Sequence, residues 1–172
     1  VIESDRPDYP VNYRPTTLVD QRIAENVIEF LTYCQKKFNW QKRLPPIQSG
    51  VGNVANAVIG ELYRSPFQKI RFWTEVFQDG MMRYVEDDDK FECASATALS
   101  FSEQGRKEFL RLFSRCREKL VLRPTWLSNH AELITRLFVI AMNTAIEVDI
   151  YAHVNSTHVD GSKIVNGLGG SG

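Results

Sequence analysis

A glutamate placed just after a short apolar run is the residue in this sequence best suited to chemistry. The run Ile70–Trp73 is typical of a buried strand, and Glu75 follows it by two residues. In open α/β sheets ligands bind at the carboxyl ends of the strands, where a carboxylate can act as a nucleophile or a base. An unpaired buried carboxylate is too costly, so Glu75 either faces water or accepts hydrogen bonds. This stretch alone leaves both interpretations open.

Two glycine-containing segments could bind an anion. The first, residues 50–52 (Gly-Val-Gly, called the glycine turn below), joins a strand predicted at residues 47–49 to a helix predicted from residue 53 to about residue 63. Glycines let the backbone approach a ligand closely, so the N–H groups of such a turn can point at an anion or an oxyanion. The second segment is the glycine-rich run at residues 166–172. A tight turn without a ligand is the alternative interpretation of the glycine turn.

Other polar residues have simpler interpretations. Ser128 and Asn129 precede a helix predicted from about residue 131 to residue 137, and either is a natural N-cap for it. His153 and His158 lie in a polar loop with no obvious third ligand, so we predict no metal site.

The composition is that of an ordinary soluble globular protein, with 43% hydrophobic and 24% charged residues. A chain of 172 residues supports one domain with a real core, or one domain plus the tail of another. The 21 basic residues balance the 21 acidic ones, so net charge indicates neither nucleic acid nor an anionic membrane as a partner. No apolar run approaches the roughly 20 residues that span a bilayer. Three widely spaced cysteines argue against a disulfide framework and fit a reducing compartment.

The elements that position these residues predict an α/β fold, with a mainly parallel central sheet flanked by helices. The strands at residues 47–49 and 70–73 should end on the same side of the sheet, which would bring the glycine turn to Glu75. A first amphipathic helix is expected from an N-cap at Asp20 to about Asn39.

Four further elements are expected after Glu75. Residues 77–85 can form a short helix. Ser102 caps a long helix whose apolar face is Phe109, Leu110, Leu112 and Phe113. Residues 138–143 and 146–151 read as two strands, the second alternating apolar and acidic as a half-buried strand does.

Four segments, in this order, resemble the acetyl-CoA hydrolase/acyl-CoA transferase family, the glutamate-dependent CoA-transferases. They are the family's glycine turn (residues 46–57), its catalytic glutamate segment (74–80), its asparagine segment (128–130) and its glycine-rich active-site loop (166–171). The resemblance covers nearly all of the chain from Pro45 onward and leans toward the acetate/succinate branch. It implies a CoA-transferase-like fold, with residues 1–43 ending an amino-terminal domain and linker helix. Residues 44–172 would then be the carboxy-terminal catalytic domain, truncated at Gly172.

The resemblance also implies a covalent mechanism. Glu75 would attack the acyl-CoA thioester to form a mixed anhydride, and CoA would return to form a glutamyl-CoA thioester. The backbone N–H groups of Val51 and Gly169 would form an oxyanion hole for the glutamyl carbonyl, and the Asn129 amide would serve the substrate carbonyl. The residues expected to contact CoA are Gly50, Gly52, Asn53, Gly167 and Gly170.

The implied partners are acyl-CoA, acetyl-CoA or succinyl-CoA, and small carboxylates. Coenzyme A would be a substrate, with no permanently bound cofactor, and hydrolysis would be the same chemistry with water as acceptor. We expect a mitochondrial location in a eukaryote and a cytoplasmic one otherwise, and a homodimer is compatible with this function.

Two other classes stay open. A sugar-phosphate isomerase or ligand-sensing domain of similar fold would use the glycine segments for phosphate and Glu75 or Asp79 as a base. A catalytically silent fragment would serve only packing or assembly.

Overall fold

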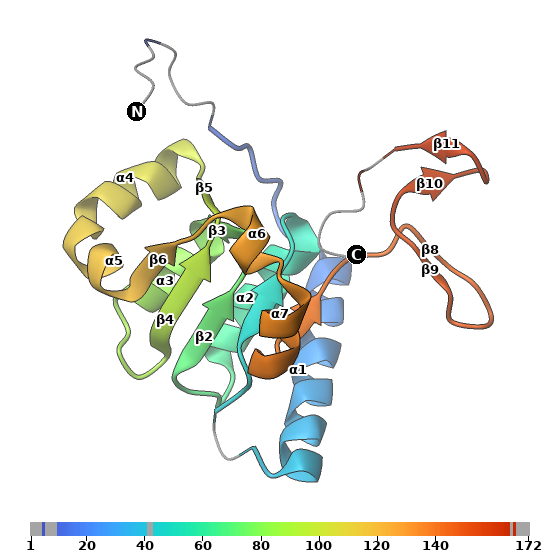
Figure 1. Ribbon diagram of the computed structural model, residues 1–172, viewed down its shortest axis with the longest axis horizontal. Coiled ribbons are helices and arrows are strands. Elements are labelled where there is room, and N and C mark those ends of the chain that lie inside the picture. The colour runs from blue at the N-terminus through green and yellow to red at the C-terminus, as the bar shows by residue number, and fades with distance from the viewer. Residues whose placement is uncertain (1–4, 6–9, 41–42, 166, 168–172) are drawn as a thin grey trace.

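Five parallel strands form the central sheet of the computed structural model, which describes residues 5, 10–40, 43–165 and 167 (Figure 1). Their order is β6-β4-β2-β1-β7. The strands are β1 (Ile47–Ser49), β2 (Ile70–Trp73), β4 (Phe91–Ala96), β6 (Leu120–Leu122) and β7 (Ile140–Met142). Since β1 and β2 are parallel neighbours, they end on the same side, as the sequence predicted. The predicted fold class is therefore confirmed.

Helices cover both faces of this sheet. They are α1 (Leu18–Phe38), α2 (Asn53–Arg64), α3 (Asp79–Val85), α4 (Glu103–Arg111), α5 (Phe113–Lys119), α6 (Thr125–Ser128) and α7 (Ala131–Leu137). Alternate residues of β2 point to opposite faces. Phe72 stacks edge to face on Tyr84 of α3, with ring centroids 5.2 Å apart, whereas Trp73 bonds to the end of α6 on the other face. In Figure 1, α2 lies behind the sheet and α7 in front of it.

The core lies between the sheet and the helices α2 and α3. Phe72, Tyr84 and Phe91 are almost fully buried there, and the Tyr84 hydroxyl donates to the Ile59 carbonyl at 2.7 Å. Burial raises the pKa of the Tyr84 phenol, because the phenolate would lose its hydration. This packing makes the sheet a rigid base for the residues at its carboxyl edge.

The first helix begins earlier than predicted. Its N-cap is Thr17, and Asp20 completes a capping box by accepting a bond from the Thr17 N–H at 2.8 Å. The prediction of Asp20 as the N-cap was wrong because the carboxylate sits three residues inside the cap. Those bonds lower the pKa of Asp20. Through Leu31 the helix joins the main core, so α1 packs with the rest of the described chain, and the boundary after residue 43 stays a prediction.

Two further expectations were wrong between residues 76 and 119. Residues 76–78 form strand β3 (Val76–Gln78), which pairs with β5 (Ala98–Ser100), and α3 begins only at Asp79. Ser102 caps its helix as predicted, accepting from the Gly105 N–H at 3.0 Å, but the helix breaks at Leu112 into α4 and α5. Leu112 is buried in the core and Phe109 packs against it, as predicted, whereas Leu110 and Phe113 are 65% and 50% exposed.

Residues 146–165, called the arm below, leave the sheet and form two small antiparallel hairpins (Figure 1). Its strands are β8 (Glu147–Val148), β9 (Val154–Asn155), β10 (His158–Val159) and β11 (Lys163–Ile164). The predicted half-buried strand at residues 146–151 was wrong. Val148 is 62% and Ile150 93% exposed, because the chain turns at Asp149 instead of pairing with the sheet.

None of the described helices combines the length and the hydrophobicity that a bilayer-spanning segment requires.

Candidate active site

Glu75 lies half-buried between β2 and β3, at the carboxyl edge of the sheet. Its backbone carbonyl accepts bonds from the N–H groups of Thr97 and Ala98, at 2.8 and 2.9 Å. Two bonds on one carbonyl hold the backbone of Glu75 against the end of the neighbouring strand β4. With the backbone held in this way, only rotation about the side-chain bonds of Glu75 can change where its carboxylate lies.

The residues that flank Glu75 attach it to the glycine turn. The Thr74 hydroxyl donates to the Ser49 carbonyl at 2.9 Å, and the Gln78 amide donates to the Gly50 carbonyl at 3.0 Å. Thr74 is 2% exposed and Gln78 fully buried; the Thr74 bond is shielded from water and the Gln78 bond partly so. The structure thus brings Glu75 and the glycine turn together at one edge of the sheet.

The side chain of Asn129 reaches Glu75 directly. Its Nδ2 donates to the Glu75 Oε1 at 2.6 Å. The N-cap position of α7 belongs to His130 and has no side-chain cap, so the helix-cap interpretation of Ser128 and Asn129 was wrong. The Trp73 indole N–H donates to the Ser128 carbonyl at 2.8 Å, and this bond holds the turn that carries Asn129 beside β2. The carboxylate is therefore hydrogen-bonded rather than merely solvated.

The glycine turn presents backbone donors next to this pair. Gly52 has φ +128°, a conformation that side chains disfavour, and it starts α2 without a side-chain cap. The Gly50 N–H donates to the Met142 carbonyl at 3.2 Å. Within the described ranges, the N–H of Val51 donates to no group, and Val51 is 53% exposed. Asn53 is half-buried at the first position of α2. An oxyanion beside Glu75 could use these donors.

Comparison with known proteins identifies the family. Residues 105–172 match the model described as "Acetyl-CoA hydrolase/transferase C-terminal domain". The chain is 44% identical over 171 residues to an acetyl-CoA hydrolase of Schizosaccharomyces pombe, covering 99% of this chain and 33% of that protein. It is 47% identical over 154 residues to a succinyl-CoA:acetate CoA-transferase of Clostridium kluyveri, covering 90% and 28%. The chain belongs to the acetyl-CoA hydrolase/transferase family.

This member of the family spans about a third of the length of the curated relatives that it matches. A solved structure of a RipA mutant has the same fold, with a TM-score of 0.70 over 91% of this chain and 34% of that one. At 17% identity this likeness concerns the fold alone.

The second glycine segment is only partly described in this family member. Gly167 is exposed beyond the arm, while Gly169 and Gly170 lie outside the described residues. The structure therefore brings Glu75, Asn129 and the glycine turn together, and the roles of Gly167, Gly169 and Gly170 stay predictions.

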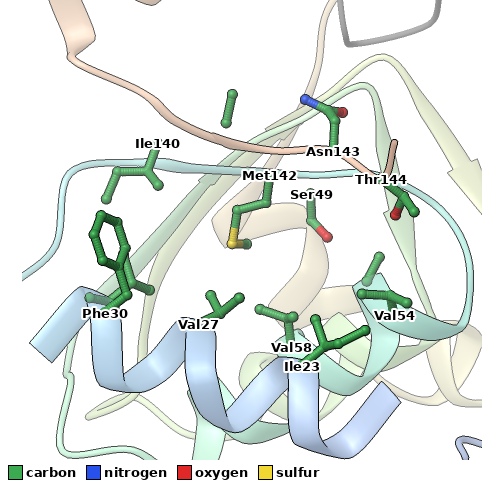
Figure 2. A pocket seen from close by; sticks show the side chains of 13 residues that line it. Ile23, Val27, Phe30, Ser49, Val54, Val58, Ile140, Met142, Asn143 and Thr144 are labelled. Atoms are coloured by element: carbon green, nitrogen blue, oxygen red, sulfur yellow. The ribbon is translucent and has the colours of Figure 1, made fainter. Parts of the chain in front are cut away.

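An open pocket of about 410 Å³ is lined by Ser49 and Val54, which flank the glycine turn (Figure 2). Val27 and Phe30 of α1 line one wall, and Met142 of β7 lines another. Neither Glu75 nor Asn129 lines it, so this apolar pocket is separate from the Glu75–Asn129 pair.

Other candidates for chemistry are occupied or inactive. The Asp79 carboxylate accepts from both the N–H and the hydroxyl of Ser102, so it secures the start of α4 instead of serving as a free base. Desolvation raises the pKa of the Cys93 and Cys116 thiols, which disfavours the thiolate. Among the described residues, no three His, Cys, Asp or Glu side chains gather as a metal site.

Sequence reasoning missed three residues that build this site. Trp73, Thr74 and Gln78 each donate to a backbone carbonyl of a segment that carries a predicted oxyanion donor. One feature of the sequence could have indicated them. Polar groups flank Glu75 in a region predicted to be buried, and buried polar groups need hydrogen-bond partners.

Proposed function

We propose that the protein to which this chain belongs transfers CoA between an acyl-CoA and a carboxylic acid, with Glu75 as the nucleophile. Acetyl-CoA and succinyl-CoA are the expected donors, because relatives of this chain are named acetyl-CoA hydrolase and succinyl-CoA:acetate CoA-transferase. The observation that carries the proposal is the Glu75 carboxylate. It is bonded to Asn129 and joined through its neighbours to a glycine turn whose Val51 N–H has no partner among the described residues.

The first step is attack of the Glu75 carboxylate on the thioester carbonyl. The C–S bond breaks, CoA leaves as the thiolate, and a mixed anhydride of Glu75 and the acyl group remains. The thiolate then attacks the glutamyl carbonyl and expels the acyl group as a free carboxylate. The glutamyl-CoA thioester that results reacts with an incoming carboxylate by the reverse sequence, which restores Glu75.

Each step places negative charge on a carbonyl oxygen, so fixed donors stabilise the transition states. The Asn129 amide already donates to Glu75, which orients the carboxylate before substrate binds. During attack the same amide would donate to the substrate carbonyl. The Val51 N–H, together with Gly169, would serve the glutamyl carbonyl, and the remaining turn residues would contact CoA.

Hydrolysis follows when water instead of a carboxylate opens the glutamyl thioester. The proposal thus covers both names carried by the relatives, and it needs no permanent cofactor because the carboxylate itself carries CoA. We further propose that residues 44–172 form the catalytic domain of a protein located in mitochondria in a eukaryote and in the cytoplasm otherwise.

The covalent intermediate tests this proposal. Full-length protein incubated with acetyl-CoA and no acceptor should accumulate glutamyl-CoA, which borohydride reduces to an alcohol. Mass spectrometry should then find the altered residue at Glu75 within the tryptic peptide of residues 72–83. An adduct on another acidic residue would move the nucleophile. Absence of any adduct, with acyl-CoA binding confirmed, would favour the isomerase or ligand-sensing classes.

A further inference from the structure

Gln78 is a fully buried amide that the proposed chemistry does not yet use. It follows Glu75 by three residues and ends β3, and its Nε2 donates to the Gly50 carbonyl at 3.0 Å. Glutamine is seldom fully buried, because its amide loses hydration unless every polar atom finds a partner. Here the second polar atom, Oε1, is buried without a partner among the described residues. A Met or Leu at this position would fill a similar volume without burying an unpaired oxygen, so packing alone does not explain the glutamine, and its bond to the Gly50 carbonyl is what distinguishes it.

The bond from Gln78 sets the direction of a neighbouring N–H. The Gly50 carbonyl and the Val51 N–H belong to one planar trans peptide and point in opposite directions. The Gly50 carbonyl accepts from Gln78 at 3.0 Å and from the Ser49 hydroxyl at 3.2 Å, so Gln78 is the shorter of two bonds that set where the Val51 N–H points. Glycine gives this turn little stiffness of its own, as Gly52 at φ +128° illustrates, so the orientation has to come from such bonds.

The same bond also strengthens the donor. A peptide whose carbonyl accepts a hydrogen bond is polarised, and its N–H becomes a better donor. The partner of Gln78 also shows which end of its amide faces the turn. The Gly50 carbonyl oxygen accepts a bond from Nε2 and would repel Oε1. In the described ranges, the Val51 N–H has no partner of its own and stays available to a ligand.

We infer that Gln78 is a positioning residue, which aims and polarises the Val51 N–H toward the oxyanion formed on Glu75. This inference rests on the proposed CoA transfer and adds a residue to it. Gln78 touches neither substrate nor the reacting atoms. It acts through the peptide between Gly50 and Val51.

Thr74 provides a matched contrast within the same segment. Its hydroxyl holds the Ser49 carbonyl at 2.9 Å, and the N–H of that peptide, on Gly50, is already used by the Met142 carbonyl. Thr74 and Gln78 are both buried and both donate to the turn. Of these two bonds, the one from Gln78 acts on the peptide whose N–H has no partner in the described ranges.

The test compares Gln78→Met with Thr74→Val in the full-length protein, using acetyl-CoA and succinate. Loss of donor alignment should lower kcat for Gln78→Met by about 10–100-fold with KM for acetyl-CoA little changed, since small misplacements of a reacting group cost this much. Its melting temperature should change little, because removing the unpaired Oε1 offsets the lost bond and the Ser49 hydroxyl still donates to the Gly50 carbonyl at 3.2 Å. Thr74→Val should lower the melting temperature more than Gln78→Met does and lower kcat less than Gln78→Met does, because the peptide that it holds has its N–H already bonded to the Met142 carbonyl.

Gln78→Glu supplies a second readout that packing does not affect. A carboxylate cannot donate to the Gly50 carbonyl, whereas the protonated acid can. The ratio of kcat for Gln78→Glu to kcat for Gln78→Met should rise as pH falls, and the ratio removes any titration that both variants share. If Gln78→Met does not fold, Gln78→Glu measured against the wild type across pH carries the same test.

These experiments distinguish failure of the proposed function from failure of the proposed role of Gln78. A wild-type protein that forms no glutamyl-CoA adduct would overturn the proposed function. A wild type that forms the adduct, with Gln78→Met keeping kcat within about threefold, would overturn the role of Gln78 alone. A flat ratio across pH would overturn it as well.

Discussion

Two carboxylate–asparagine pairs in this molecule have the same chemistry and different surroundings. Asn129 Nδ2 donates to Glu75 Oε1 at 2.6 Å, and Asn155 Nδ2 donates to Glu147 Oε2 at 2.9 Å. The first pair joins residues 54 positions apart at the edge of the sheet, and the second joins residues 8 apart across a hairpin of the arm.

The surroundings decide what each pair can do. Beside Glu75 lies a turn held by the buried side chains of Thr74 and Gln78, and its Val51 N–H has no partner in the part of the chain that the structure describes. Beside Glu147, the Asn155 Oδ1 accepts from the N–H groups of Thr157 and His158, both at 3.0 Å, so that asparagine organises a turn. A carboxylate bonded to an amide is therefore not a site by itself. Donors for a developing charge, on a rigid framework, make the difference.

Removing the two carboxylates separates the pairs most strongly. Glu75→Ala in the full-length protein should abolish CoA transfer, because it removes the proposed nucleophile. Glu147→Ala should keep turnover within about threefold, since only a hairpin bond is lost. Steady-state assays with acetyl-CoA and succinate measure both. Retained transfer by purified Glu75→Ala would break the comparison, and so would inactivity of a folded Glu147→Ala.

The packing around the two pairs should contribute differently to the free energy of unfolding. Phe77 is fully buried two residues after Glu75, whereas Ile150 is 93% exposed in the arm. Phe77→Ala should lower the free energy of unfolding by about 3–5 kcal/mol through the cavity it leaves. Ile150→Ala should change it by less than about 0.5 kcal/mol. Denaturant titrations of the full-length variants give these values, and equal losses would show that the full-length protein buries the arm.

The two asparagines should separate by activity instead of stability. Asn129→Ala should reduce kcat by about 10²–10³-fold, the effect of losing one oxyanion donor. Asn155→Ala should leave kcat nearly unchanged and lower only the protection of the hairpin amides, because its bonds lie within the arm. Stopped-flow or steady-state rates check the first, and hydrogen exchange checks the second. A variant of Asn129 with lower melting temperature and normal kcat would make that residue structural.

The smallest expected effect is a loss of amide protection in the arm at low pH. Bonds from the His153 and Tyr151 N–H groups and from the His153 ring lower the pKa of Asp149 in the arm. A depressed pKa in the folded state contributes stability above the unfolded value of about 3.9, and this contribution is lost as pH falls through the folded value. Amide protection of Tyr151 and His153 should thus decrease in acid before that of β2. Unchanged protection in the arm would contradict this order.

Local patterns predicted much of the fold. The apolar runs at β1 and β2, the helix α2 and the Ser102 cap were placed correctly, because burial and capping depend on residues close in sequence. The arm was placed wrongly, since alternation at residues 146–151 describes a strand without saying what pairs with it. The family resemblance supplied Glu75, Asn129 and the glycine turn, and it also supplied Gly169, which lies outside the described residues.

The sequence by itself determined which groups are available: a carboxylate after a buried strand, an asparagine before a short helix and a glycine turn. Only the tertiary structure decided that Asn129 bonds to Glu75 instead of capping α7, and that Gln78 holds the Gly50 carbonyl. The physical reason is reach. A cap is satisfied within one turn of chain, whereas these contacts need parallel strands to bring distant segments to a common edge, where the burial of neighbouring residues fixes their direction.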